Sequence, residues 1–216
     1  MTINIIIATR NAHKVRELAT LLASPGVRWK SLREFPHIPA VKEDGRSFAV
    51  NAIKKARAVA KAVGGLVLAD DSGLEVDALG GAPGIRSARF AGGHGDDAAN
   101  NRKLLRLLEG VPPSRRRARY RCVLALASPT RLLALTHGTW SGRIAPGPKG
   151  RGGFGYDPVF LVPGLRKTVG ELPLRVKHQL SHRAQAAQRM RGALRRLSAQ
   201  RPRDFGAGRP GRGRPA

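Results

Sequence analysis

Two adjacent carboxylates are the residues of this sequence most clearly suited to a chemical role. Asp70 and Asp71 follow the apolar run Leu66–Ala69 and precede Ser72. Neighbouring carboxylates repel each other, so burying them together is costly unless a hard cation such as Mg²⁺ is bound there. The alternative is an exposed turn, because Asp, Ser and Gly are all turn-forming residues. We expect the pair at the carboxyl end of a buried strand, where the ligand clefts of α/β sheets lie.

A second candidate site joins the first predicted strand to the first predicted helix. It reads Thr9-Arg10-Asn11-Ala12-His13-Lys14. A helix N-terminus presents free backbone N–H groups and a positive dipole end to an anion, and Thr9, Asn11 and Lys14 add a hydroxyl, an amide and an ammonium. The segment therefore predicts a triphosphate cradle without a glycine-rich loop. The same residues also fit a helix start that Asn11 caps, with Lys14 in solvent.

Two further segments could recognise a flat ligand. The first reads Gly152-Gly153-Phe154-Gly155-Tyr156-Asp157-Pro158. Its glycines allow close approach of the backbone to a ligand and Phe154 is available to stack on a base, although a tight turn whose aromatic side chains fill the core fits equally well. The second segment places the donors Lys177, Ser181, His182 and Arg183 at the start of the last predicted helix. These donors fit a carbonyl-bearing base, or a helix start capped by Ser181 with solvated basic residues.

The elements that must position these residues alternate between strands and helices. Continuous or alternating apolar runs predict strands at Ile3–Ala8, Leu66–Ala69, Arg119–Ala127, Leu132–His137 and Val159–Val162, with Thr139–Ile144 continuing the sheet. Apolar residues at helical spacing predict helices at Asn11–Leu22, Ser47–Val63, from Asp96 or Asp97 to before Gly110, and Leu180–Leu197. Leu74–His94 is glycine-rich and is expected to be an ordered loop. This interleaving predicts an α/β protein with a mixed sheet.

Composition limits the broad class of protein. The length of 216 residues suits one compact domain, which we place at residues 1–198, followed by a disordered Gly/Pro/Arg-rich tail at 199–216. Cys122 is the one cysteine, which excludes an intramolecular disulfide and indicates the reducing cytoplasm. No apolar run is long enough to span a bilayer, and we expect no signal peptide.

The formal net charge of +26 requires an explanation. One is nucleic-acid binding, since lysine and arginine release counterions from phosphate backbones. The other is an arginine-rich solvated surface, which the absence of aromatic residues between the arginines of the segment Ser114–Arg119 favours. In either case a positive field speeds the encounter with a polyanionic small substrate.

Together, in this order and spacing, these segments resemble the family of inosine/xanthosine triphosphate pyrophosphatases. The matching segments are ATRNAHKVRELATLL, EDGRSFAVNAIKKA, LADDSGLEVDALGGAPGIRSARFAGG, GGFGYDPVF and the lysine followed by SHRAQA. The resemblance runs from about Ile3 to Leu197. It implies an elongated, two-lobed α/β fold with a curved mixed sheet flanked by helices, an active-site cleft between the lobes, and a homodimer.

The resemblance also implies a reaction and residue roles. The reaction is Mg²⁺-dependent hydrolysis of ITP, dITP and XTP to the monophosphate and pyrophosphate. Residues 9–14 would hold the phosphates, Glu43 and Asp71 would bind the metal with Asp70 in support, and Asp71 would activate the attacking water. The residues implied to contact the nucleoside are Ser72, Phe154, Gly155, Tyr156, Asp157, Lys177, His182 and Arg183.

Three departures from the family pattern stand in this sequence. Arg10 replaces a common glycine, Val50 replaces a common glutamate, and the stretch Leu172–Val176 replaces an acidic one.

Two alternative functions remain open. The first is a nucleic-acid-binding protein that uses its basic surface and tail, and the second is a pyrophosphatase for modified pyrimidine nucleotides.

Overall fold

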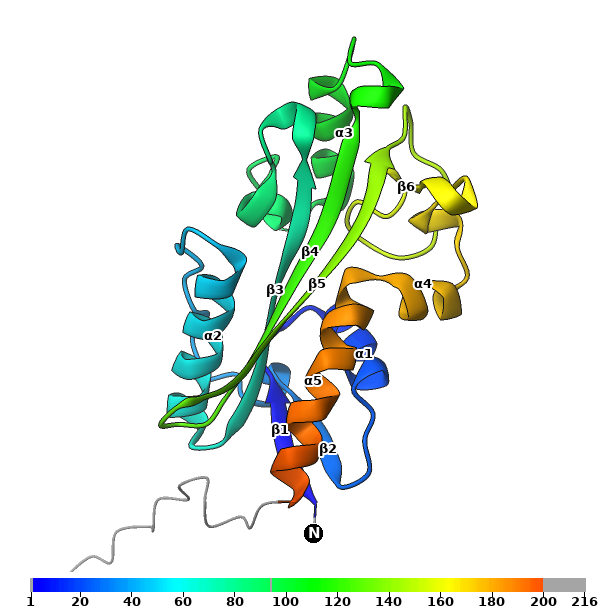
Figure 1. The fold of residues 1–216 in the computed structure, drawn as a ribbon. Coiled ribbons are helices and arrows are strands. Elements are labelled where there is room, and N and C mark those ends of the chain that lie inside the picture. The colour runs from blue at the N-terminus through cyan, green and yellow to red at the C-terminus, as the bar shows by residue number, and fades with distance from the viewer. Residues whose placement is uncertain (1, 94, 200–216) are drawn as a thin grey trace, which may run out of the picture.

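A seven-stranded mixed sheet forms the centre of the computed structural model, which describes residues 2–93 and 95–199 (Figure 1). Its strand order is β2-β1-β3-β4-β5-β6-β7. The strands are β1 (Ile3–Ile7), β2 (Val27–Ser31), β3 (Leu66–Val76), β4 (Arg117–Ala127), β5 (Leu132–Ile144), β6 (Phe160–Val162) and β7 (Lys167–Thr168). β1 is parallel to both neighbours, whereas β3 to β7 pair in antiparallel fashion. The predicted α/β class with a mixed sheet is confirmed.

Five α-helices flank the sheet among the described residues. They are α1 (Ala12–Leu21), α2 (Phe48–Val63), α3 (Asp97–Leu107), α4 (Leu174–Leu180) and α5 (His182–Ala199). The side chains of Asn11, Ser47 and Asp96 accept backbone hydrogen bonds at the starts of α1, α2 and α3. Gly64 ends α2 with a left-handed φ of 65°. The sequence signals for helix starts and stops therefore act where they were expected.

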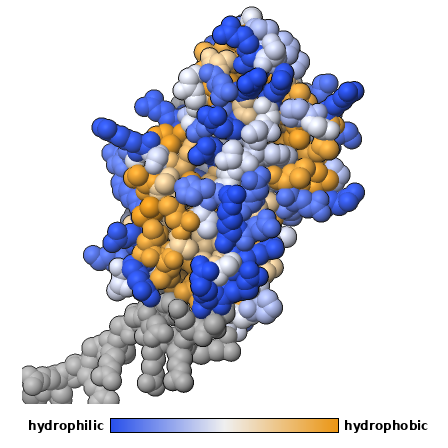
Figure 2. All heavy atoms as spheres, viewed as in Figure 1, coloured by the Kyte–Doolittle hydropathy of each residue, from blue (hydrophilic) through white to orange (hydrophobic). Residues whose placement is uncertain are grey.

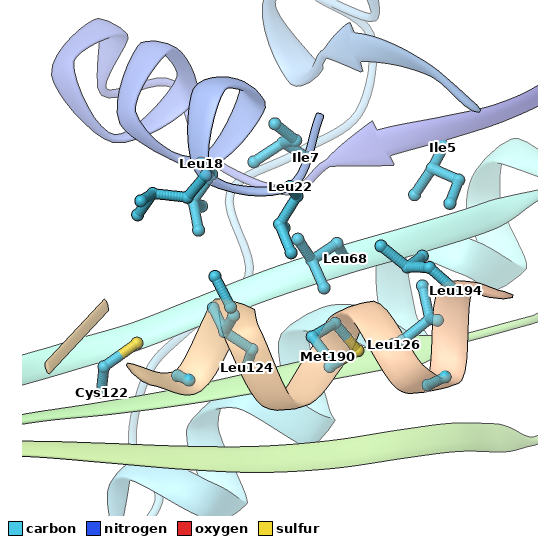
Figure 3. Packing of buried hydrophobic residues seen from close by; sticks show 14 of the residues in the cluster. Ile5, Ile7, Leu18, Leu22, Leu68, Cys122, Leu124, Leu126, Met190 and Leu194 are labelled. Atoms are coloured by element: carbon cyan, nitrogen blue, oxygen red, sulfur yellow. The ribbon is translucent and has the colours of Figure 1, made fainter. Parts of the chain in front are cut away.

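Alternation along β4 divides the core between the sheet faces. Cys122, Leu124 and Leu126 pack toward α1 and α5, whereas the intervening Val123 and Ala125 pack toward α2. Figure 3 shows Leu18 of α1, Leu22 at the C-cap of that helix, and Met190 and Leu194 of α5 gathered over the first of these faces. Each such side chain contributes about 1.5–3 kcal/mol on burial. A third cluster joins α3 to the far end of the sheet and builds the second lobe.

The central strands are longer than predicted. β3 continues from Leu66 to Val76, so Asp70 and Asp71 lie in the middle of a strand and not at its end. The predicted loop Leu74–His94 accordingly begins as strand and continues as short 3-10 turns at Asp77–Leu79 and Gly84–Arg89. The hairpin of β4 and β5 is confirmed, and β5 runs unbroken through the predicted continuation to Ile144.

The last helix begins two residues later than predicted. Ser181 ends α4 and its hydroxyl accepts from the backbone of Ala184 at 3.1 Å, so α5 starts at His182. Leu180, expected on the buried stripe, belongs to α4 and is 40% exposed. The expected tail lies outside the described residues from position 200 onward. Its first residue, Ala199, ends α5.

Figure 2 shows hydrophilic residues over much of one face, interrupted by apolar areas beside α2 and on the right of the view. Among the described residues, no helix is both long enough and apolar enough to cross a membrane.

Candidate active site

The candidate site lies where β1 separates from β3. Ile7 pairs with Leu68 at the end of the parallel ladder, and β3 then continues alone along that edge. Asp70 and Asp71 follow immediately, so their carboxylates are next to the carboxyl end of β1 and the start of α1. The strand whose carboxyl end lies here is therefore β1 and not, as expected, the strand that carries the two aspartates.

The cleft at this edge collects most of the predicted residues. Its lining residues include Thr9, Asn11, Lys14, Glu43, Asp71, Ser72, Phe154, Gly155, Tyr156, Asp157, Lys177, His182 and Arg183. Arg10, Ala12, His13 and Asp70 are not among the lining residues. The guanidinium of Arg10 instead donates to the carbonyl of Ile38 at 2.6 Å. The large cation at this departure from the family pattern is thus directed away from the cleft.

Asp70 is the buried centre of an ion network. Its Oδ1 accepts from Lys14 Nζ at 2.7 Å and from Ser72 Oγ at 2.8 Å. Its Oδ2 accepts from Arg183 Nε at 2.8 Å. Burial alone raises a carboxyl pKa, but Lys14 and Arg183 outweigh it and hold the pKa of Asp70 well below its ordinary value. Asp70 is therefore a permanent anion that fixes the two cations.

Asp71 is equally buried but lacks such partners. It is 5% exposed, and its Oδ2 has no hydrogen-bond partner among the described residues. Burial raises its pKa to about 6, which Lys55 opposes and Glu43 reinforces. The burial of Asp71 excludes the alternative that the two aspartates lie in an exposed turn. An unpaired acceptor beside a second carboxylate suits a bound cation.

Glu43 comes to the same place from an irregular segment before α2. Its carboxylate forms an ion pair with Lys55, and its side chain is 31% exposed. Arg89 donates to its backbone carbonyl at 3.1 Å. No group of three or more His, Cys, Asp or Glu residues in the described chain is arranged to hold a metal ion. Two carboxylates nevertheless fit Mg²⁺, which is commonly bound by one or two carboxylates plus water and substrate phosphates.

The start of α1 confirms the predicted cap at Asn11, while phosphate binding there stays a prediction. Asn11 Oδ1 accepts from the backbone N–H groups of His13 at 2.9 Å and Lys14 at 3.2 Å, so Asn11 is a cap. Lys14 is not in solvent, because its side chain is 20% exposed and it is paired with Asp70. Burial opposes its charge, but Asp70 more than compensates and the pKa of Lys14 is raised. Lys14 is therefore a fixed cation at the cleft.

A buried polar network organises the opposite end of the cleft. Asp157 accepts from Lys177 Nζ at 2.6 Å, from Tyr120 Oη at 3.1 Å and from the backbone of Phe154 at 2.9 Å. Burial raises the pKa of Asp157, and Lys177 opposes that rise. Gly153 has a φ of 78°, and a Cβ there would collide with the Asp157 carboxylate. The glycine is thus required by the network.

The basic residues at this end are buried. Lys177, His182 and Arg183 are 4%, 4% and 2% exposed, which excludes the alternative of solvated basic residues. The ring of His182 stacks on Tyr120 at 4.6 Å between centroids, and its Nδ1 has no partner among the described residues. Burial holds the pKa of His182 well below its ordinary value, so the imidazole is neutral.

The two aromatic residues of the glycine-rich segment have different places. Tyr156 is 4% exposed in the core and donates to the carbonyl of Ser87 at 2.9 Å. Phe154 instead stacks on His13 with centroids 5.5 Å apart, and Lys177 Nζ lies 4.4 Å from its ring centroid. The core-filling alternative therefore holds for Tyr156, whereas the stacking of Phe154 on a base stays a prediction.

Several site residues were missed in the sequence, among them three that pair with predicted ones. Lys55 lines the cleft and pairs with Glu43, Tyr120 lines it and binds Asp157, and the 6% exposed Glu17 pairs with Arg183 at 2.8 Å. Lys55 follows Ala52 by three residues and precedes Ala56, so it adjoins the apolar stripe of its helix. Charged residues on or beside a buried stripe were the available signal for Lys55 and Glu17.

Comparison with known proteins gives consistent matches. The model of the Ham1 family matches residues 5–193. The dITP/XTP pyrophosphatase of Desulforamulus reducens is 53% identical over 193 residues, covering 89% of this chain and 96% of that protein. The dITP/XTP pyrophosphatase of Geobacillus kaustophilus is 54% identical over 182 residues, covering 84% and 89%.

Solved structures agree with the sequence matches. A HAM1 protein from Coxiella burnetii is 39% identical with a TM-score of 0.82, covering 90% of this chain and all (100%) of that chain. A nucleoside-triphosphatase / dITP/XTP pyrophosphatase from Mycobacterium abscessus is 42% identical with a TM-score of 0.69, covering 90% and 97%.

Proposed function

This chain belongs to the Ham1 family, and from that premise we propose that it is a nucleoside triphosphate pyrophosphatase. Its substrates are the non-standard purine nucleotides ITP, dITP and XTP, which it cleaves to the monophosphate and pyrophosphate. The observation that carries the proposal is Asp71, whose buried carboxylate has an unpaired oxygen and a pKa raised to about 6 in the cleft. An unpaired carboxylate oxygen in the cleft can accept a proton from an attacking water.

The phosphate end has the groups that the reaction needs. Thr9, Asn11 and Lys14 bind the triphosphate, and Lys14 faces the charge that develops on the departing pyrophosphate. Asp71 takes a proton from the water that attacks the α-phosphorus, and the bond from that phosphorus to the pyrophosphate oxygen breaks. Asp70 holds Lys14 in position through their 2.7 Å ion pair. Glu43 and Asp71 would hold Mg²⁺, which when bound neutralises charge on the phosphate oxygens.

The base end supports purine selectivity. Phe154 offers its ring to the base, and Lys177, His182 and Arg183 are donors placed to meet an oxygen at position 6. Adenine carries an amino group there, which is itself a donor and cannot accept a hydrogen bond from these residues. Mismatches of that kind can lower kcat/KM by about 10⁴- to 10⁵-fold.

A nucleotide panel tests the proposed reaction. The protein is incubated with Mg²⁺ and ITP, dITP, XTP, ATP or GTP, and release of pyrophosphate and orthophosphate is followed separately. We expect pyrophosphate as the initial product and rapid cleavage of the first three nucleotides only. Orthophosphate as the initial product, or equal rates on all nucleotides, contradicts the proposal. Preferential cleavage of UTP or dTTP would support the pyrimidine alternative instead.

Two substitutions test the residue roles. Asp71→Asn should lower kcat by roughly 10²- to 10⁴-fold, the range for a lost proton-transfer group. Lys14→Ala should lower it by about 10²- to 10³-fold, the range for a lost electrostatic stabiliser of the transition state. Circular dichroism checks that each variant folds, and Lys54→Ala is a matched control because Lys54 pairs with Asp44 on the exposed side of α2. Normal turnover in either variant refutes the role given to that residue.

We further propose a Mg²⁺-dependent homodimer in the cytoplasm. The metal is supported by the fit of Glu43 and Asp71, the dimer by the resemblance to the family, and the compartment by the buried free thiol of Cys122. Removal of divalent cations with EDTA should abolish turnover, and added Mg²⁺ should restore it.

Light scattering during gel filtration should give twice the chain mass of 23.2 kDa. A monomer mass contradicts the dimer.

A further inference from the structure

Helix α3 holds the loop at the base end through side chains one helical turn apart. Asp97 Oδ2 accepts from the backbone N–H of Gly155 at 2.6 Å. Asn101 Nδ2 donates to the carbonyl of the same glycine at 2.9 Å. Residues four apart share one face of a helix, so this face grips both polar groups of one residue.

Gly155 is held in a conformation that glycine, which lacks a Cβ, adopts more readily than other residues. Its φ is 65°, in the left-handed region, and no atom lies within 4 Å of the place a Cβ would occupy. The space beside its Cα is therefore open, and packing on that side does not hold the residue in place. The two hydrogen bonds from α3 are its described restraints, and they fix the direction of the chain that leaves Phe154.

Phe154 is consequently restrained on both sides. Its own N–H donates to Asp157 Oδ2 at 2.9 Å, and the residue after it is held by Asp97 and Asn101. Its ring lies beside Lys177 and Arg183, whose charged groups are 4.4 and 5.6 Å from the ring centroid. A small rotation of the backbone at Gly155 would carry this ring away from the donors of the base end.

Helix α3 is itself a firm support. Leu104 and Leu108 are fully buried, and Asn100 accepts from the backbone of Ala91 at 2.7 Å. Asp97 is not needed as the N-cap of α3, because Asp96 already caps the helix by accepting from the backbone N–H of Ala99 at 2.8 Å. The carboxylate of Asp97 is therefore available to the loop, and Asp97 also lines the cleft.

From this geometry we infer that Asp97 and Asn101 are positioning residues that set the ring of Phe154 against the base of the substrate. The inference rests on the proposed function, because it assumes that a purine occupies this end of the cleft. The pair acts on the base and not on the phosphates, which bind at the start of α1. Loss of either side chain should weaken nucleoside recognition selectively.

The products of the reaction separate the two ends of the cleft. Calorimetric titrations of the full chain with IMP and, separately, with pyrophosphate in the presence of Mg²⁺ report each end without turnover. Asp97→Ala and Asn101→Leu should weaken IMP binding by roughly 3- to 10-fold, the range for a misplaced aromatic contact. Both variants should bind pyrophosphate as the unaltered protein does. In kinetics the KM for ITP should rise while kcat stays within about twofold.

Matched variants distinguish positioning from general damage. Asp97→Asn keeps an acceptor for Gly155 and should retain IMP affinity, while Arg102→Ala removes an exposed side chain of the same helix and should change nothing. Asn101→Ser replaces Asn101→Leu if the latter does not fold. Unchanged IMP affinity in Asp97→Ala and in the Asn101 variant overturns the inference, as does an equal loss of IMP and pyrophosphate affinity. If the unaltered protein neither binds IMP nor cleaves ITP, the proposed function fails together with the inference.

Discussion

Asp70 and Asp71 are chemically identical neighbours with opposite electrostatic environments. Alternation along β3 directs Asp70 toward α1 and α5, where Lys14 and Arg183 hold its pKa well below the ordinary value. Asp71 is directed to the other face, near Lys55 and Glu43, and its pKa is raised to about 6. One residue is thus a fixed counterion and the other a carboxylate that can exchange a proton. A one-residue shift in the register of β3 would exchange these roles.

His182 should remain neutral at pH values where an ordinary imidazole is charged. Burial and the adjacent Arg183 lower its pKa well below 6.5. The unfolded chain binds this proton near pH 6.5 and the folded chain does not, so His182 reduces stability as the pH falls below about 6.5. Histidine ring resonances followed by NMR from pH 8 to about 5 check this. Assignment uses His182→Gln, and a His182 midpoint near 6.5 would falsify the prediction.

At the scale of elements, Arg183 joins three pieces of the fold. It donates from α5 to Asp70 on β3 and to Glu17 on α1, each at 2.8 Å, with its side chain 3% exposed. Arg183→Ala leaves two buried carboxylates without this partner and should lower the free energy of unfolding by about 3–5 kcal/mol. Urea denaturation measures the loss.

Two further variants make the Arg183 experiment specific. Glu17→Gln combined with Arg183→Ala should be less destabilised than the sum of the single changes, because one stranded charge is removed. Arg191→Ala is a matched control that should cost about 1 kcal/mol, since the exposed Arg191 of α5 donates, among the described residues, only to the carbonyl of Leu21. Equal losses for Arg183→Ala and Arg191→Ala would show that the buried pairs are unimportant.

Helix α5 lies directly against β5 at Gly138. A Cβ there would collide with the carbonyl oxygen of His182 and would lie 2.7 Å from the backbone nitrogen of Ala186. Gly138→Ala should therefore destabilise the protein by about 1–3 kcal/mol and displace the helix that carries the base-reading residues. Gly192→Ala, in the same helix with its nearest neighbour at 3.7 Å, should instead stabilise by about 0.5–1 kcal/mol. Thermal melts compare the two, and a lower Tm for Gly192→Ala contradicts this account.

The predictable elements are those with local signals. Caps at Asn11, Ser47 and Asp96 located the starts of the first helices, and the strong apolar run of the hairpin located its strands. β2 was missed because Val27–Ser31 is a short edge strand of mixed polarity. The extension of β3 through Asp70 and Asp71 was missed because acidic residues disfavour a strand unless distant partners neutralise them. Those partners, Lys14 and Arg183, come from elements that the sequence places far away.

The candidate site shows the same division. Spacing and family resemblance located the cleft residues, since each predicted segment contributes to the lining. Which of two adjacent carboxylates is paired, and which aromatic ring fills the core, depends on contacts between elements distant in sequence. Asp70 meets Arg183 across 113 positions, and Tyr156 meets Ser87 across 69. Local patterns carry no signal for contacts at that separation.

At the scale of the whole molecule, the charge of +26 accompanies an enzyme with an anionic substrate. Part of the charge lies along β4, where Arg117, Arg119 and Arg121 alternate with buried residues. Arg119 is paired with Glu75 at 2.6 Å. The alternative function predicts nucleic-acid binding that weakens when residues 201–216 are deleted. This stays a separate prediction, because those residues lie outside the described part of the chain.

The positive field of the molecule should accelerate capture of the triphosphate. Raising NaCl from about 20 to about 300 mM shortens the Debye length severalfold, so kcat/KM should fall by roughly 10-fold while kcat changes little. Arg117→Glu combined with Arg121→Glu reverses charge outside the cleft lining and should reduce the salt dependence without altering kcat at saturation. Sucrose at matched osmolarity controls for effects of the solvent. A kcat that falls with salt while KM stays constant would place the effect in the chemical step and contradict electrostatic steering.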